Sequence, residues 1–127
     1  MTPAQERCLL RRPYRVTGRD ASGIDCLGVV LQILEWHGKK VIDPWRNLVK
    51  AYKDNAIHDR HAFGSDWSRV HDGTLQSLDI LLYHEAHSWS AIISDAYVWS
   101  AHPEAGVWRR PLHQLHKRPN EVWRQTC

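Results

Sequence analysis

A cysteine opens an apolar segment within RDASGIDCLGVV, the stretch from Arg19 to Val30. Cys26 follows small and polar residues, and the apolar residues after it have helical spacing, which predicts a thiol in the first turn of a helix. Unpaired backbone N–H groups and the helix dipole favour the thiolate there, and the thiolate is the reactive form. The same N–H groups can bind an oxyanion. Cys26 is therefore a candidate nucleophile, and the alternative from its position alone is a buried structural cysteine.

A nucleophilic cysteine needs a base, and the base needs an orienting group, which can both lie far along the sequence. The later part of the chain offers His84, His87, Ser100 and His102. Alternate side chains of a strand share a face, so Ser100 and His102 point the same way. If the two strands form a hairpin, one histidine from each can point at the helix end that carries Cys26. For each histidine taken singly, a solvated surface position is favoured over a catalytic role.

The first half of the chain predicts the helices that must hold the cysteine. Pro13 ends the first helix, Gly38 caps the second, and Asp43 caps a third with Pro44 in its first position. Residues 14–24 and 55–74 are rich in polar and turn-forming residues and predict loops. The predicted helices therefore span residues 2–12, 25–37 and 43–55.

The second half differs in composition and predicts the strands that carry the histidines. The segments LDILLYHE, WSAIISD, AYVWSAH and GVWRRPL are short, rich in β-branched and aromatic residues, and separated by turn formers. They predict an antiparallel meander of three or four strands. Helices followed by strands indicate an α+β fold, and 127 residues predict a single domain, residues 1–127, with a real hydrophobic core.

Composition excludes several other classes of protein. The net charge of +3 is spread along the chain, which does not favour nucleic-acid binding. No apolar run approaches the ~18 residues of a membrane span, and no hydrophobic signal peptide is expected. Three cysteines without a CxxC pair argue against a disulfide framework or zinc knuckle. His84 and His87 have a spacing that suits a helix rather than the predicted strand and loop, so no metal site is expected.

Several segments resemble one known family. RPYRVTGRDASGIDCLGVV is similar to the nucleophile loop and helix start of NlpC/p60 papain-like cysteine peptidases and amidases, in particular their short phage-tail members. LDILLY, WSAIIS, VWSAHPEAGV and EVWR resemble the family's later strands, so the resemblance covers about residues 8–124. It implies a papain-like NlpC-type fold, in which the nucleophile helix packs on a small antiparallel sheet that carries the base.

The resemblance also implies an activity. Family members cleave amide bonds in peptidoglycan stem peptides through an acyl-enzyme, and they need no metal or organic cofactor. The phage-tail subgroup implies tail hub or tip proteins as partners, a place in the virion, and synthesis in the bacterial cytoplasm. The alternative is a catalytically weak or inactive NlpC-like component of the tail tip or baseplate. Other cysteine chemistry, such as acyl transfer, is a further alternative.

The resemblance assigns the site residues in part by alignment. Cys26 falls on the catalytic cysteine, Tyr14 on a tyrosine that lines the site, and Asp25 on the acid before the cysteine. Without a gap, the family's base histidine falls on Trp89 and its third polar residue on Ser100. The residues predicted to be catalytic are Cys26, His87 and His102, and those predicted to contact substrate are Tyr14, Asp25, Trp89 and Ser100.

The assignment of His87 and His102 depends on a shift of two residues relative to the ungapped alignment. Such a shift preserves the strand face that each side chain occupies, although it requires a bulge or local realignment. One further departure lies on the strand before, where Leu78 replaces the glycine that the family usually has ahead of Asp79.

Overall fold

The computed structural model describes residues 1–39, 41, 66–85 and 88–126. The α+β class predicted from the sequence is confirmed, whereas the predicted helix within residues 43–55 lies outside the described residues. In chain order the elements are α1 Pro3–Leu10, β1 Arg19–Asp20, β2 Gly23–Ile24, α2 Cys26–Trp36, β3 Trp67–Arg69, β4 Ile80–Tyr83, β5 Trp89–Ser94, β6 Tyr97–His102, β7 Gly106–Pro111, the 3-10 turn η1 Leu112–Gln114 and β8 Glu121–Gln125.

Six strands form the main sheet, with the order β3-β8-β4-β5-β6-β7 and antiparallel neighbours throughout. The predicted meander is present as β4 to β7. The last strand, β8, returns along the other side of β4 and separates it from β3. The prediction of a loop over residues 55–74 is wrong for Trp67–Arg69, because these residues pair with β8 and form an edge strand. Residues 14–24 were likewise predicted as a loop, but the structure forms the short antiparallel hairpin β1–β2 there.

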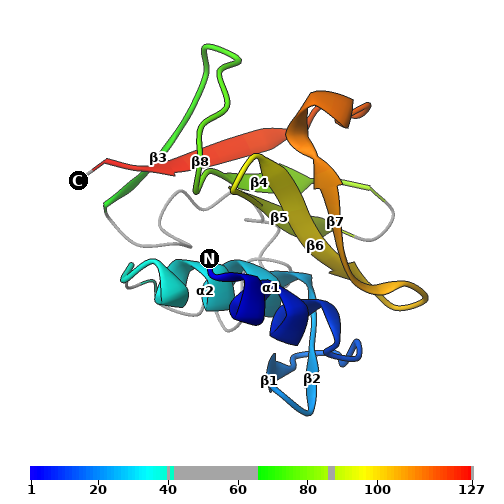
Figure 1. The fold of residues 1–127 in the computed structure, drawn as a ribbon. Coiled ribbons are helices and arrows are strands. Elements are labelled where there is room, and N and C mark those ends of the chain that lie inside the picture. Colours follow the sequence, from blue (N-terminus) through cyan, green and yellow to red (C-terminus); the bar gives the residue numbers. More distant parts are fainter. Residues whose placement is uncertain (40, 42–65, 86–87, 127) are drawn as a thin grey trace.

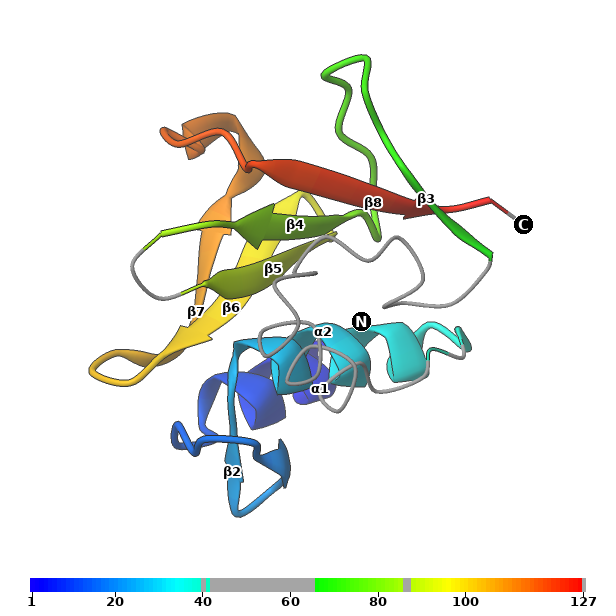
Figure 2. The ribbon, with the colours of Figure 1, turned by 180° about the vertical axis from the view of Figure 1, so that it is seen from behind.

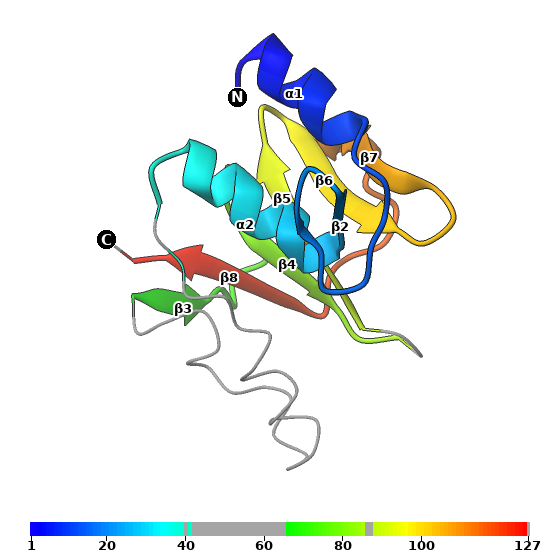
Figure 3. The same cartoon turned by 90° about the horizontal axis from the view of Figure 1, so that it is seen from below.

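Both helices lie on one side of the sheet, while η1 and the segment before β4 lie on the other (Figures 1 and 2). Figure 3 shows α2 running across β5 and β6. The main core lies between α2 and this face of the sheet, where Val30, Ile33 and Leu34 of the helix meet Ile92 and Trp99. No helix within the described ranges is long and apolar enough to cross a membrane.

The start of α2 is set by its own sequence. Asp25 is the N-cap residue, and its Oδ1 accepts a hydrogen bond from the Gly28 N–H at 2.7 Å. The helix ends with His37 as C-cap, and Gly38 follows in the left-handed region with φ +72°. Local capping and periodicity therefore place Cys26 in the first turn, as the sequence predicts.

The opposite face of the sheet carries a second apolar cluster. Leu81, Tyr83, Ile93, Val98 and Val122 belong to it and are buried. Partly buried side chains from the segment before β4 and from η1 and the residues after it pack against this cluster. They include Val70, Leu75, Leu112 and Leu115. Within the described residues, no α-helix covers this side of the sheet.

Leu78 lies in the left-handed region with φ +68°, where the resembled family usually has glycine. An L-residue with a Cβ is strained by about 1–2 kcal/mol in this conformation, and glycine is not. We expect Leu78→Gly to be more stable than Leu78→Ala by about 1 kcal/mol, because both lose the side chain and only glycine relieves the strain. Urea unfolding of the two variants measures this difference. If Leu78→Ala is instead the more stable variant, as is usual at extended or helical positions, the backbone at Leu78 is not strained.

Candidate active site around Cys26

The first residue of α2, Cys26, lies in a pocket of about 570 Å³ and is partly exposed. Walls of this pocket come from the loop before α2, the connection between β4 and β5, and the β6–β7 hairpin. The residues that line it are Tyr14, Cys26, Glu85, Ser88, Trp89, Ala101, His102, Pro103 and Trp108. Four of the residues predicted to form the site, Cys26, Tyr14, Trp89 and His102, are therefore brought together.

Asp25 holds the loop that precedes α2. Its side chain is buried, and Oδ1 accepts from Gly28 N and from Arg19 Nη1, each at 2.7 Å. Oδ2 accepts from Thr17 N at 3.0 Å. These contacts turn the carboxylate toward the loop and helix, and Asp25 is not among the residues lining the pocket.

Gly28 lets the same loop approach the helix closely. A Cβ at this position would lie 2.5 Å from the backbone oxygen of Gly18 and 2.6 Å from Ile24 Cγ1. The first N–H groups of a helix have no intrahelical partner. Asp25 accepts from Gly28, and in the described part of the chain Cys26 and Leu27 keep their N–H groups available at the helix end.

We expect Asp25→Ala to lower the free energy of unfolding by about 2–3 kcal/mol, because three N–H donors lose a buried charged acceptor. Denaturant unfolding measures the loss. Asp20→Ala is the matched control, since that carboxylate is exposed and, among the described residues, accepts hydrogen bonds from Ser22 within its own turn. Equal losses in the two variants would contradict the buttressing role of Asp25.

Tyr14 forms one wall of the pocket and is partly buried. Its backbone makes a parallel bridge to Ile24, which fixes it beside the start of α2. Burial raises the pKa of the Tyr14 phenol, and negative charge on Cys26 and on Asp25 raises it further. The phenol therefore keeps its proton and can donate a hydrogen bond to a group in the pocket.

Trp89 also lines the pocket and is held by aromatic contacts. Its ring stacks on Tyr83 with centroids 3.9 Å apart and planes 3° apart, and meets Trp108 edge-on at 6.1 Å. Trp89 Nε1 donates to Glu85 at 3.3 Å, and Glu85 also pairs with Lys117. An indole has no basic nitrogen, so this side chain contributes surface and packing but no proton acceptor.

The Tyr83 ring under Trp89 is itself anchored. Its hydroxyl donates to the backbone oxygen of Lys117 at 2.9 Å. Burial, with a smaller contribution from Glu85, raises the pKa of Tyr83 to about 12. The stack therefore remains uncharged across the pH range in which hydrolases are assayed.

The other predicted site residues are placed differently. His102 is exposed at the pocket edge, and its Nδ1 accepts from Glu104 N at 3.1 Å. Ser100 is fully buried, and its hydroxyl donates to the backbone oxygen of Ser90 at 2.7 Å, outside the pocket lining. His87 lies outside the described residues.

Sequence reasoning did not single out Glu85 or Trp108 as pocket residues. Glu85 follows β4 and Trp108 lies on β7, so their meeting depends on the strand order and on the twist of the sheet. The sequence contains seven tryptophans, and this content is a signal for an aromatic groove or interface. Among the described residues, no group of three or more His, Cys, Asp or Glu side chains could hold a metal ion.

Comparison with solved structures shows that the fold of this chain is a known one. The chain is similar to the solved NlpC/p60 domain of the peptidoglycan hydrolase SagA, with 15% sequence identity and a TM-score of 0.57. The similarity covers 94% of this chain and 92% of that domain. The chain therefore has an NlpC/p60-type α+β fold, as its segments predict. No family model and no curated protein matches the sequence.

Proposed function

We propose that this chain is a cysteine-dependent amidase or endopeptidase that cuts peptide amide bonds in peptidoglycan. The observation that carries the proposal is the partly exposed Cys26 thiol at the N-terminus of α2, inside a pocket walled by Tyr14 and Trp89. The similar SagA domain belongs to a peptidoglycan hydrolase, which supports this substrate class. The resemblance of the sequence to short phage-tail enzymes supports a place in the tail, next to tail hub or tip proteins.

The proposed reaction forms and breaks one thioester. Cys26 Sγ attacks the amide carbonyl, and the oxyanion is bound by the backbone N–H groups of Cys26 and Leu27, with Tyr14 as a further donor. His87 takes the thiol proton and returns it to the leaving amine. Water then attacks the thioester, releases the carboxylic acid and restores the thiol. His102 holds the base in its working tautomer.

Two observations favour a second candidate function, that of a structural tail component with a weak or absent active site. Trp89, which has no proton acceptor, occupies the pocket position where the ungapped alignment expects the base. His102 accepts the Glu104 N–H through Nδ1, so its neutral form carries the proton on Nε2 and donates there. To orient a base, His102 would have to accept a hydrogen bond from it, and for that it must give up the bond from Glu104.

Alkylation by iodoacetamide near neutral pH tests the proposal without a substrate. We expect Cys26 to react about tenfold faster than the exposed Cys8, because the helix end and the base favour its thiolate. His87→Ala is expected to remove this advantage, while His113→Ala, on the remote η1 turn, leaves it intact. Peptide mass spectrometry measures each site separately. Similar rates at Cys26 and Cys8 in every variant would favour the structural alternative.

A further inference from the structure

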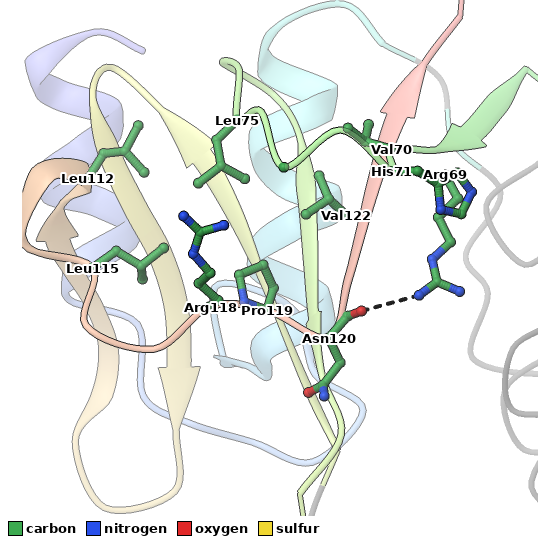
Figure 4. A pocket seen from close by; sticks show the side chains of 11 residues that line it. Arg69, Val70, His71, Leu75, Leu112, Leu115, Arg118, Pro119, Asn120 and Val122 are labelled. Atoms are coloured by element: carbon green, nitrogen blue, oxygen red, sulfur yellow. Dashed lines mark hydrogen bonds between the residues drawn. The ribbon is translucent and has the colours of Figure 1, made fainter.

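A second groove lies on the face of the sheet away from α1 and α2. It has a volume of about 410 Å³ and runs between the segment before β4, the segment after η1, and β8 (Figure 4). It shares no lining residue with the Cys26 pocket. Val122 on β8 forms part of its floor, and Pro119 and Asn120 border it where β8 begins.

The interior of this groove is apolar. Leu75, Leu112 and Leu115 line it together with Val70 and Val122. The three leucines pack against the second apolar cluster but remain only partly buried, in contrast to the closed core under α2. Apolar side chains that stay accessible in a concave site gain free energy when a partner covers them. The shape and lining suit one bulky apolar side chain from outside.

The rim of the groove is basic. Arg69, His71 and Arg118 line it, and none of its described lining residues is acidic. Arg118 makes no hydrogen bond or ion pair, as far as the described residues extend, and Arg69 donates one hydrogen bond to the backbone oxygen of Asn120 at 3.3 Å. Both guanidinium groups therefore keep donors that can bind carboxylates.

Two acidic residues, Asp72 and Glu121, are chain neighbours of lining residues, and both are already engaged. Asp72 accepts from the backbone and hydroxyl of Thr74, and Glu121 pairs with His84. The neighbouring segment RRPLHQLHKR, residues 109–118, contains four lysine and arginine residues and no acid, and within it Arg109 pairs with Glu6 and Lys117 with Glu85. The excess of positive charge around an apolar floor defines the complementary partner as acidic and apolar.

We propose that this groove binds an acidic segment of a partner protein, which inserts one bulky apolar side chain among Leu75, Leu112 and Leu115. Carboxylates on either side of that side chain pair with Arg69 and Arg118. The apolar anchor supplies the burial and the two arginines fix the register, as at the centres of other protein interfaces. The interaction does not use Cys26, so it is independent of the proposed hydrolase activity.

The test is a titration of the full chain with synthetic peptides, followed by backbone amide NMR. The probe is an amidated peptide with one leucine flanked on each side by glutamate and aspartate. Controls replace the leucine by alanine or the acidic residues by lysine. We expect the probe to shift amides of residues 69–75 and 112–122, and each control peptide to bind about tenfold more weakly.

Variants locate the binding in the groove. Arg118→Glu and Leu115→Ala are each expected to weaken binding of the probe about tenfold, with the far-ultraviolet circular dichroism unchanged. Arg7→Glu makes the same charge change on α1, far from the groove, and is expected to leave the affinity unaltered. Cys26→Ala is also expected to bind normally, which separates this proposal from the catalytic one.

Three results would overturn the proposal. In the first, the probe fails to bind at millimolar concentration or shifts residues of the Cys26 pocket instead. In the second, sedimentation shows a dimer that Leu115→Ala dissociates, which assigns the groove to a second copy of this chain. In the third, the chain binds vesicles rich in phosphatidylglycerol through Arg118 and ignores the peptide, which assigns it to a lipid surface.

Discussion

Cys26→Ala is expected to abolish the release of soluble peptides from purified peptidoglycan, with a loss of about 10³-fold or more. The pocket holds Cys26 at the helix end, where backbone N–H groups can bind an oxyanion, and among the described residues no other cysteine lines it. Removal of the nucleophile leaves only substrate binding, which does not form an acyl-enzyme. New amino groups and soluble peptides released per unit time measure the activity.

Cys8→Ala is the matched control for this experiment, because Cys8 is exposed on α1 and outside the pocket. It is expected to keep the activity of the unaltered chain. If both variants digest peptidoglycan at the original rate, the hydrolysis does not depend on Cys26 and the proposed mechanism fails. If the unaltered chain releases nothing, the structural alternative gains support.

Asp79→Asn is expected to lower the free energy of unfolding by about 3 kcal/mol, because it leaves the buried end of an ion pair without its charge. Asp79 is fully buried, and its two carboxylate oxygens accept from Nε and Nη2 of Arg124, each at 2.8 Å. Oδ2 also accepts from Gln76 N at 2.8 Å. This carboxylate therefore joins the turn before β4 to the last strand.

Chemical denaturation of Asp79→Asn and Glu104→Gln separates the buried pair from a general effect of charge. Glu104 is exposed in the β6–β7 turn, and the loss of its charge is expected to change stability by less than about 0.5 kcal/mol. If Asp79→Asn lowers the free energy of unfolding no more than Glu104→Gln does, the role of the Arg124 pair is contradicted. Asn at position 79 keeps the size of the side chain, so packing is not the variable.

Local signals in the sequence were sufficient for several features. The N-cap residue and the helical spacing of apolar residues place Cys26 at the start of α2, and both are properties of consecutive residues. Alternation and turn formers likewise mark β4 to β7. The resemblance of the cysteine segment to NlpC/p60 proteins pointed to the fold that the structural comparison supports.

The strand order could not be read from the same signals. β3 is a three-residue strand in a polar stretch, and it exists because β8 offers it a partner from the far end of the chain. The insertion of β8 beside β4 also depends on contacts distant in sequence, including the pair between Asp79 and Arg124. Such pairings follow from tertiary packing and leave little trace in local composition.

The assignment of the base shows why local sequence does not decide every residue of the pocket. A shift of two residues leaves every side chain of a strand on its original face, so sequence patterns fit both Trp89 and His87 equally well. In the folded chain, the stack of Trp89 on Tyr83 and its bond to Glu85 hold the indole in the pocket. The sequence thus determined α2, with Cys26 in its first turn, and the meander, because these arise from neighbouring residues. The walls of the pocket, including Glu85, Trp89 and Trp108, required the three-dimensional packing of strands that lie apart in the chain.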